Sequence, residues 1–77
     1  MILRNRMRIS GTELELLEVV NKLGPCSSEK VHQTAEPDSE YLLVLRKLHM
    51  LVEKGFLQRI VINRQTLYRT PGNYNTI

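Results

Sequence analysis

The sequence predicts a mainly α-helical domain of three helices followed by a small β-hairpin. From residue 43 to residue 54 the apolar side chains recur every three or four positions, as in an amphipathic helix. After Gly55 their spacing tends towards two, as in a strand. Two earlier segments have helix-capping residues at their starts and Gly or Pro at their ends. Seventy-seven residues suffice for one such domain with a small core.

The first helix is predicted to begin near Ser10, which lies three residues before Glu13 at the spacing of a capping box. Thr12 and Glu15 offer an alternative frame for the same box. The Gly-Pro pair at 24–25 ends the helix, because Gly suits the position after a helix and Pro cannot continue one. Between these ends we expect one broad apolar stripe to face the core, formed by Leu14, Leu16, Leu17, Val20 and Leu23.

A short second helix is predicted next. Ser27 or Ser28 is its N-cap, and Glu29 lies in the first turn, where the helix dipole favours an acid. This helix is about two turns long, so it buries little beyond Val31 and Ala35.

The third helix is predicted over 39–54 and ends at Gly55. Asp38 or Ser39 is its expected N-cap. Asp38 and Glu40 place negative charge at the helix N-terminus, which stabilises the helix but repels phosphate. The expected core face comprises Tyr41, Val44, Leu45, Leu48, Leu51 and Val52. The expected outward face carries Leu43, Arg46, Met50 and Glu53, with Lys47 and His49 on its flanks.

Residues 57–70 are predicted to form the β-hairpin, because β-branched and apolar residues flank a polar turn at 63–65. The predicted domain spans 10–71, between a basic N-terminal arm at 1–9 and a flexible tail at 72–77. Helix, short helix, turn, long helix and hairpin in this order make a winged helix-turn-helix, in which the hairpin is the wing.

Basic charge is concentrated at the two ends of the sequence. Residues 1–11 carry three arginines and no acid, residues 12–40 carry seven acids and two lysines, and residues 41–77 carry six bases and one acid. This distribution predicts that one face of the domain meets a polyanion and another does not.

Several classes of function lack their signals in this sequence. No apolar run approaches the roughly 18 residues of a membrane span, and the start has no apolar secretory segment. We therefore expect a cytoplasmic protein that does not enter a membrane. There is no Gly-rich phosphate loop, nucleophile elbow or pair of catalytic carboxylates, so we do not expect an enzyme. His32, His49 and the single Cys26 lack metal-ligand spacing, and no metal or cofactor is expected.

Three stretches carry a resemblance to a known family: ISGTELELLEVVNKLGPCSSEKV, VLRKLHMLVEKGFLQRIV and LYRTP, within residues 9–71. Together with the Ser10–Glu13 spacing and the Gly-Pro pair after the first helix, they resemble the DNA-binding domain of the penicillinase and methicillin-resistance repressors. The resemblance implies a dimeric transcriptional repressor. It also implies that the helix at 39–54 enters the major groove and the hairpin at 57–70 lies along the DNA backbone.

The sequence departs from that family in two respects. The repressors carry threonines at the positions that match Leu43 and Arg46, where bases are approached. They also have a helical dimerisation region after the wing, and the printed sequence ends just past the wing. We therefore expect a homodimer to use another surface, or the chain to be either a fragment of a larger regulator or a stand-alone module.

The predicted contacts with double-stranded DNA lie on the third helix and the wing. Base reading is expected from Arg46, which can pair with guanine, and from Leu43. Phosphate contacts are expected from Lys47 and from Arg64 at the wing tip. The remaining expected contacts are Met50, Arg59, Asn63, Gln65 and Arg69, with arm contacts from Arg4, Arg6 and Arg8.

Two other interpretations of these surfaces stay open. The Leu42/Leu43/Met50 face could bind a protein partner without DNA, because it is a small apolar cluster between cations. The apolar residues of the arm, including Ile9, could pack on a second subunit. In a third reading the domain only dimerises a larger assembly.

Overall fold

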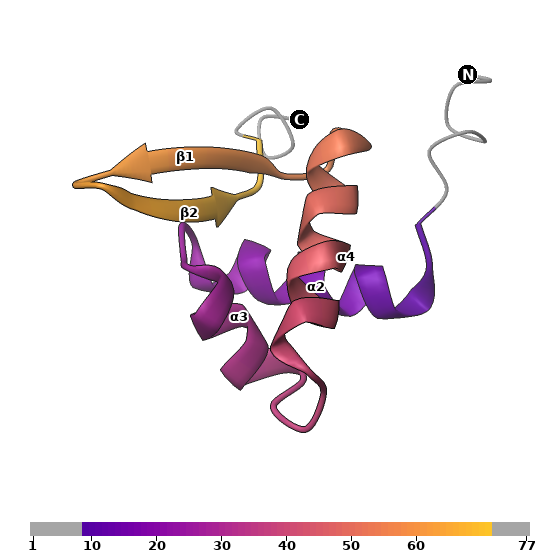
Figure 1. The fold of residues 1–77 in the computed structure, drawn as a ribbon. Coiled ribbons are helices and arrows are strands. Elements are labelled where there is room, and N and C mark those ends of the chain that lie inside the picture. Colours follow the sequence, from indigo (N-terminus) through magenta and orange to yellow (C-terminus); the bar gives the residue numbers. More distant parts are fainter. Residues whose placement is uncertain (1–8, 72–77) are drawn as a thin grey trace, which may run out of the picture.

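The computed structural model describes residues 9–71, which form three helices and a two-stranded antiparallel sheet (Figure 1). The elements are α2 (Gly11–Leu23), α3 (Ser28–Ala35), α4 (Tyr41–Glu53), β1 (Gln58–Ile62) and β2 (Gln65–Arg69). Their order and type confirm the predicted winged helix-turn-helix. The expectations for Arg4, Arg6, Arg8 and the tail at 72–77 lie outside the described residues. Ile9 is half-buried and packs against the core of the domain.

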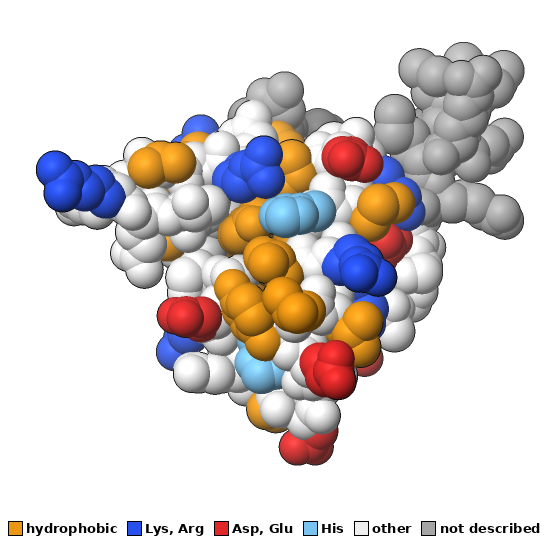
Figure 2. All heavy atoms as spheres, in the orientation of Figure 1, with side chains coloured by type: hydrophobic (Ala, Val, Ile, Leu, Met, Phe, Trp, Pro, Cys, Tyr) orange, Lys and Arg blue, Asp and Glu red, His pale blue; other side chains and the backbone are white. Residues whose placement is uncertain are grey.

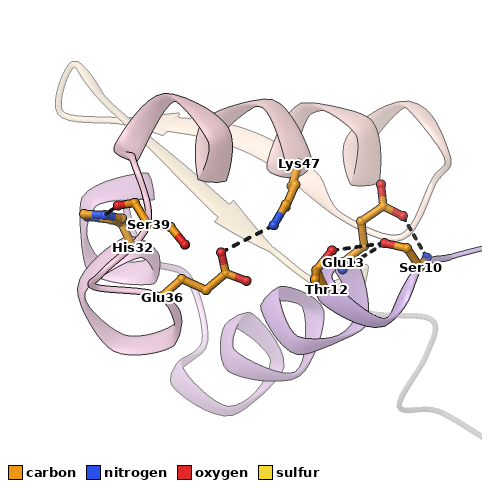
Figure 3. Close-up of polar contacts among 7 residues, drawn as sticks. All are labelled: Ser10, Thr12, Glu13, His32, Glu36, Ser39 and Lys47. Atoms are coloured by element: carbon orange, nitrogen blue, oxygen red, sulfur yellow. Dashed lines mark hydrogen bonds and ion pairs between the residues drawn. The ribbon is translucent and has the colours of Figure 1, made fainter.

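The capping box predicted at the start of α2 is confirmed. The Glu13 N–H donates to Ser10 Oγ at 3.2 Å, and the Ser10 N–H donates back to Glu13 Oε1 at 3.1 Å (Figure 3). The same carboxylate accepts a hydrogen bond of 2.8 Å from Lys54 Nζ, just past the end of α4. Burial acts to raise the pKa of Glu13, but the hydrogen bonds from Lys54 and Ser10 and the charge of Lys54 outweigh it and lower the pKa.

The starts of α3 and α4 are built differently. Ser27 caps α3, and its Oγ accepts from the Lys30 N–H at 3.2 Å. The N-cap of α4 is Glu40, and it makes no side-chain capping bond. The predicted cap by Asp38 or Ser39 is therefore wrong. Ser39 instead pairs through its carbonyl oxygen with the His32 ring, 2.7 Å from Nε2 (Figure 3), which holds it one residue before the cap.

The core lies between the three helices and the inner side of the hairpin. Its six fully buried side chains are Leu16, Val20, Val31, Val44, Leu48 and Leu51. Cys26, Leu57 and Tyr68 complete it, and half-buried Leu17 and Ala35 pack against it. The prediction that Leu14 and Leu23 face the core is wrong, because these side chains are 43% and 44% exposed.

The core face predicted for α4 is confirmed at Val44, Leu48 and Leu51, which are fully buried, and Leu45 and Val52 beside them are half-buried. The prediction is wrong for Tyr41. Tyr41 was expected in the core but is 36% exposed. Its hydroxyl lies 2.6 Å from Ser28 Oγ, and its ring meets the His32 ring edge-on at a centroid distance of 5.8 Å. A phenol hydroxyl needs a polar partner, and these contacts provide one at the surface of α3.

The wing is a hairpin with a two-residue turn. Ile62 pairs with Gln65, so Gln65 belongs to β2, and the predicted three-residue turn is too long by one. Asn63 and Arg64 have φ values of +54° and +66°, as a type I′ turn requires. This turn matches the right-handed twist of the two strands, which explains why it is preferred over a longer one.

A backbone bridge joins the wing to the connection between α2 and α3. The Cys26 N–H donates to the Tyr68 carbonyl at 3.0 Å, and the Tyr68 N–H donates to the Cys26 carbonyl at 2.8 Å. Burial raises the pKa of the Cys26 thiol, although the charge of Lys30 opposes the shift. The thiol is therefore a packed, protonated group at a structural junction.

None of the helices among residues 9–71 has the length and hydropathy that a membrane span requires.

Candidate nucleic-acid interface

The outward face of α4 follows from the three side chains that anchor its inner face. Val44, Leu48 and Leu51 are fully buried, so the residues on the opposite side of the helix point to solvent. The exposed residues on that side are Leu42, Leu43, Arg46, His49, Met50 and Glu53. Leu42 is the most exposed of the helix leucines, at 67%.

A shallow groove runs between α4 and the hairpin. Its walls are Tyr41, Leu45 and His49 on α4, Arg59, Thr66 and Tyr68 on the hairpin, and Ser28 on α3. In the hairpin register Arg59 lies opposite Tyr68, so both side chains occupy the same face of the sheet. Tyr68 is buried against the helices, and exposed Arg59 therefore borders the groove next to α4.

The predicted cationic contacts divide into two groups in the structure. Arg46, Arg59 and Arg64 are exposed and make no ion pair with any acid among residues 9–71. Lys47 is half-buried, and its Nζ lies 3.4 Å from Glu36 Oε1 (Figure 3). The structure therefore leaves the three arginines exposed, places only Arg59 of them in the groove, and directs Lys47 towards the end of α3.

The remaining wing residues lie on different sides of the hairpin. Arg69 pairs in register with Gln58, and its Nε donates to Gln58 Oε1 at 3.1 Å. Because side chains alternate along a strand, Arg69 occupies the sheet face opposite Arg59. Asn63 and Gln65 are exposed at and beside the turn.

Charge is unevenly distributed over this face of the molecule. Figure 2 shows basic side chains at the hairpin tip and beside the upper part of α4, and acidic side chains both towards the end where α4 begins and beside its upper end. Between them, hydrophobic side chains gather over the middle of the helix. Asp38 and Glu40 lie at the start of α4, where the positive end of the helix dipole stabilises acids.

Sequence analysis missed part of this surface. His49 was assigned to a flank, yet it is exposed and lines the groove. The sequence could have predicted this position, because Leu42, Arg46 and His49 are four and three residues apart and therefore lie on one face of a helix. Thr66 and the hydroxyl of Ser28 could not be foreseen, since their placement depends on hairpin register and on how α3 packs.

The exposed side chains at this surface can make contacts of two kinds. Guanidinium groups can neutralise phosphates or pair with guanine, and apolar side chains can touch methyl groups. Within residues 9–71 no three His, Cys, Asp or Glu side chains come together as a metal site needs.

Comparisons with known proteins agree with this geometry. A solved structure described as an ArsR-like transcriptional regulator from Rhodococcus sp. RHA1 superposes with a TM-score of 0.75 at 15% sequence identity, over 94% of this chain. This chain spans 65% of the length of that one. A search among curated proteins returned no match. The penicillinase repressor family model matches residues 9–73, so the chain, which has the fold of a winged-helix transcriptional regulator, belongs to the penicillinase repressor family.

Proposed function

We propose that this protein binds double-stranded DNA and acts as a transcriptional repressor. In this proposal α4 enters the major groove and the β1–β2 hairpin lies along the backbone. The observation that carries it is the exposure of three arginines on the helix and the hairpin, with Arg46 on the outward face of α4, Arg59 in the groove beside α4 and Arg64 at the wing tip. Family membership supports the repressor role, because occupying a promoter is the direct way in which such a small domain would block transcription.

Each arginine has a distinct part in the proposed complex. Arg46 projects from the outward face of α4, where a guanidinium can donate two hydrogen bonds to guanine O6 and N7. Arg59 borders the groove and would contact a phosphate beside the helix. Arg64 at the wing tip would reach a phosphate or the minor groove, with Asn63 and Gln65 contributing neutral backbone contacts.

The other two predicted cations contribute less in this proposal. The Lys47 amine is engaged with Glu36, so a phosphate contact would first have to break that pair. Arg69 lies on the sheet face away from α4 and would serve the hairpin through Gln58. We therefore assign both residues mainly to the fold.

The test is a binding measurement with fluorescent duplexes, first of random sequence and then enriched by selection. Wild-type affinity should fall steeply with salt, because neutralised phosphates release counterions. Arg46→Ala should cost about 1–3 kcal/mol on the selected duplex and little on random DNA. Arg64→Ala should weaken both and reduce the salt slope by about one.

The matched control is Lys22→Ala, which removes one exposed positive charge from α2, away from the proposed interface. It should leave binding nearly unchanged. The proposal is wrong if wild-type protein shows no duplex binding at low salt. It is also wrong if the arginine variants, with folded spectra, bind as tightly as Lys22→Ala.

A protein-interaction module is the second candidate function, and the exposure of Leu42, Leu43 and Met50 favours it. That function predicts that Arg46→Ala and Arg64→Ala leave the activity intact. It also predicts that Leu43→Asp abolishes binding to a defined protein partner. The second function would replace the first if the wild-type protein does not bind DNA at low salt and the three variants behave as just described.

A further inference from the structure

The outward face of α4, which is proposed to enter the major groove, carries three exposed apolar side chains beside the polar Arg46, His49 and Glu53. Leu42, Leu43 and Met50 are 67%, 45% and 41% exposed on this face. Only Arg46 and His49 stand among them as groups that can donate a hydrogen bond. A helix that reads bases chiefly by hydrogen bonds would carry Asn, Gln, Ser or Thr at such positions.

Only one feature of the major groove suits apolar side chains of this kind. Base edges present hydrogen-bond donors and acceptors there, and burying these against leucine without a partner is unfavourable. The C5 methyl group of thymine is the exception, because it is apolar and projects into the groove. The methyl of 5-methylcytosine occupies the same position on its ring.

The spacing along α4 separates the apolar contacts into two sets. Leu43 and Met50 are seven residues apart, which is about 10 Å along the helix axis. That distance corresponds to roughly three base pairs at about 3.4 Å each. Arg46 projects between them, so a guanine contact would fall between two methyl-bearing positions.

The charges near this apolar patch argue for DNA as its occupant. Arg46 lies within the patch and, like Arg59 and Arg64 on the hairpin, makes no ion pair with an acid among the described residues. Exposed Glu40 and Glu53 flank the patch at the two ends of α4. A phosphate backbone beside the patch would satisfy these cations while the leucines face the base edges.

We propose that α4 reads C5-methyl groups in the major groove, with Leu42, Leu43 and Met50 as the methyl contacts and Arg46 setting the register on guanine. This inference rests on the proposed DNA binding. It specifies the target class as duplexes with thymine or 5-methylcytosine on both sides of a guanine.

The experiment replaces thymine by deoxyuridine in the selected duplex. This change keeps base pairing and every hydrogen-bonding group and removes only the methyl. Affinity should fall about fourfold for each methyl contacted, as expected for burial of one such group. Loss of two methyl contacts should therefore weaken binding about fifteenfold.

A double-mutant cycle between protein and DNA assigns the effect to the leucines. Leu43→Ala should bind the thymine duplex more weakly and lose part of the discrimination against deoxyuridine. Arg46→Ala should bind weakly but keep its methyl sensitivity. Placing 5-methylcytosine opposite guanine at the positions that tolerate cytosine should raise wild-type affinity.

The outcomes distinguish this inference from the function on which it rests. Equal wild-type affinity for the thymine and deoxyuridine duplexes overturns methyl reading and leaves DNA binding intact. An unchanged thymine-to-deoxyuridine ratio in Leu43→Ala also overturns it, because the effect would then come from the DNA itself. Absence of all duplex binding overturns both.

Discussion

Glu40 presents a conflict between the stability of α4 and its proposed function. It occupies the N-cap, is exposed and makes no capping hydrogen bond. It therefore stabilises the helix mainly through the attraction between its negative charge and the positive end of the helix dipole. The same carboxylate would lie near phosphate once α4 enters the major groove. An acid at this position weakens non-specific attraction, and it leaves more of the affinity to contacts with bases.

Glu40→Gln should therefore tighten binding to random duplex DNA. The expected gain is roughly threefold to fivefold at low salt, because one repulsive charge near the backbone is removed, and it should shrink as salt screens the interaction. Anisotropy titrations at several salt concentrations measure it. Glu18→Gln, an exposed acid on α2, is the matched control. An equal gain in both variants would show that only net charge matters.

At the scale of the elements, the wing tip combines a strained backbone with a charged side chain. Arg64 has a φ of +66°, in the left-handed region where a residue with a Cβ is destabilised and Gly is not. A type I′ turn prefers Asn followed by Gly, and this turn has Asn63 followed by Arg64. A non-glycine residue with a positive φ is unusual at this turn position. It indicates that the arginine side chain has a function that outweighs the conformational free energy it costs.

Arg64→Gly should make the protein more stable and bind DNA less well. Relief of the left-handed strain, less the greater chain entropy of unfolded Gly, should add about 0.5–1 kcal/mol to the free energy of unfolding in urea. Loss of the cation should weaken DNA binding and its salt dependence. Asn63→Gly is the control, since Asn already tolerates this conformation and the arginine remains. A destabilised Arg64→Gly variant would contradict the strain argument.

The elements show where sequence reasoning succeeds and where it stops. The Ser10–Glu13 capping box is local, so four residues of sequence are enough to predict it. The core face of α4 was predicted correctly except for Tyr41 at its edge, because the apolar pattern of the helix does not show where that face ends. Packing against α2 and α3 then selects the arc centred on Val44, Leu48 and Leu51.

The candidate site depends on contacts between segments far apart in the sequence, and such contacts could not be predicted from the sequence. Cys26 and Tyr68 are joined by two backbone hydrogen bonds that fix the wing against the helices. No local pattern predicts such a bridge. The placement of Arg59 beside His49 depends on it and on the hairpin register. The sequence thus indicated which residues are basic and outward-facing, but not that Arg59 lies in the groove beside α4.

At the scale of the whole molecule, the Glu13–Lys54 pair connects the first turn of α2 to the end of α4. Glu13 is buried, with 8% of its surface exposed, and the Lys54 Nζ lies 2.8 Å from its Oε1. Because Glu13 also closes the capping box, one side chain serves both the start of α2 and the junction between α4 and the wing. The orientation of the proposed recognition helix therefore depends on its charge.

Glu13→Gln should destabilise the fold at neutral pH and do so less in acid. The pKa of Glu13 is lower in the folded protein, so its stabilising effect is fully present above the unfolded pKa and is lost as pH falls through the folded value. Removing the charged hydrogen bonds should reduce the free energy of unfolding by about 1.5–3 kcal/mol at pH 7. Urea titrations should show this difference shrinking below about pH 4.

Glu15→Gln is the matched control for this pH dependence, because Glu15 is an exposed acid two residues away on α2. Its stability difference from wild type should stay small at every pH. A Glu13→Gln difference that persists unchanged at pH 3 would mean that shape rather than charge is responsible. If the charge is responsible, acid should loosen the α2–α4 junction before the core melts, and chemical shifts at Lys54 and Gly55 should follow the titration of Glu13.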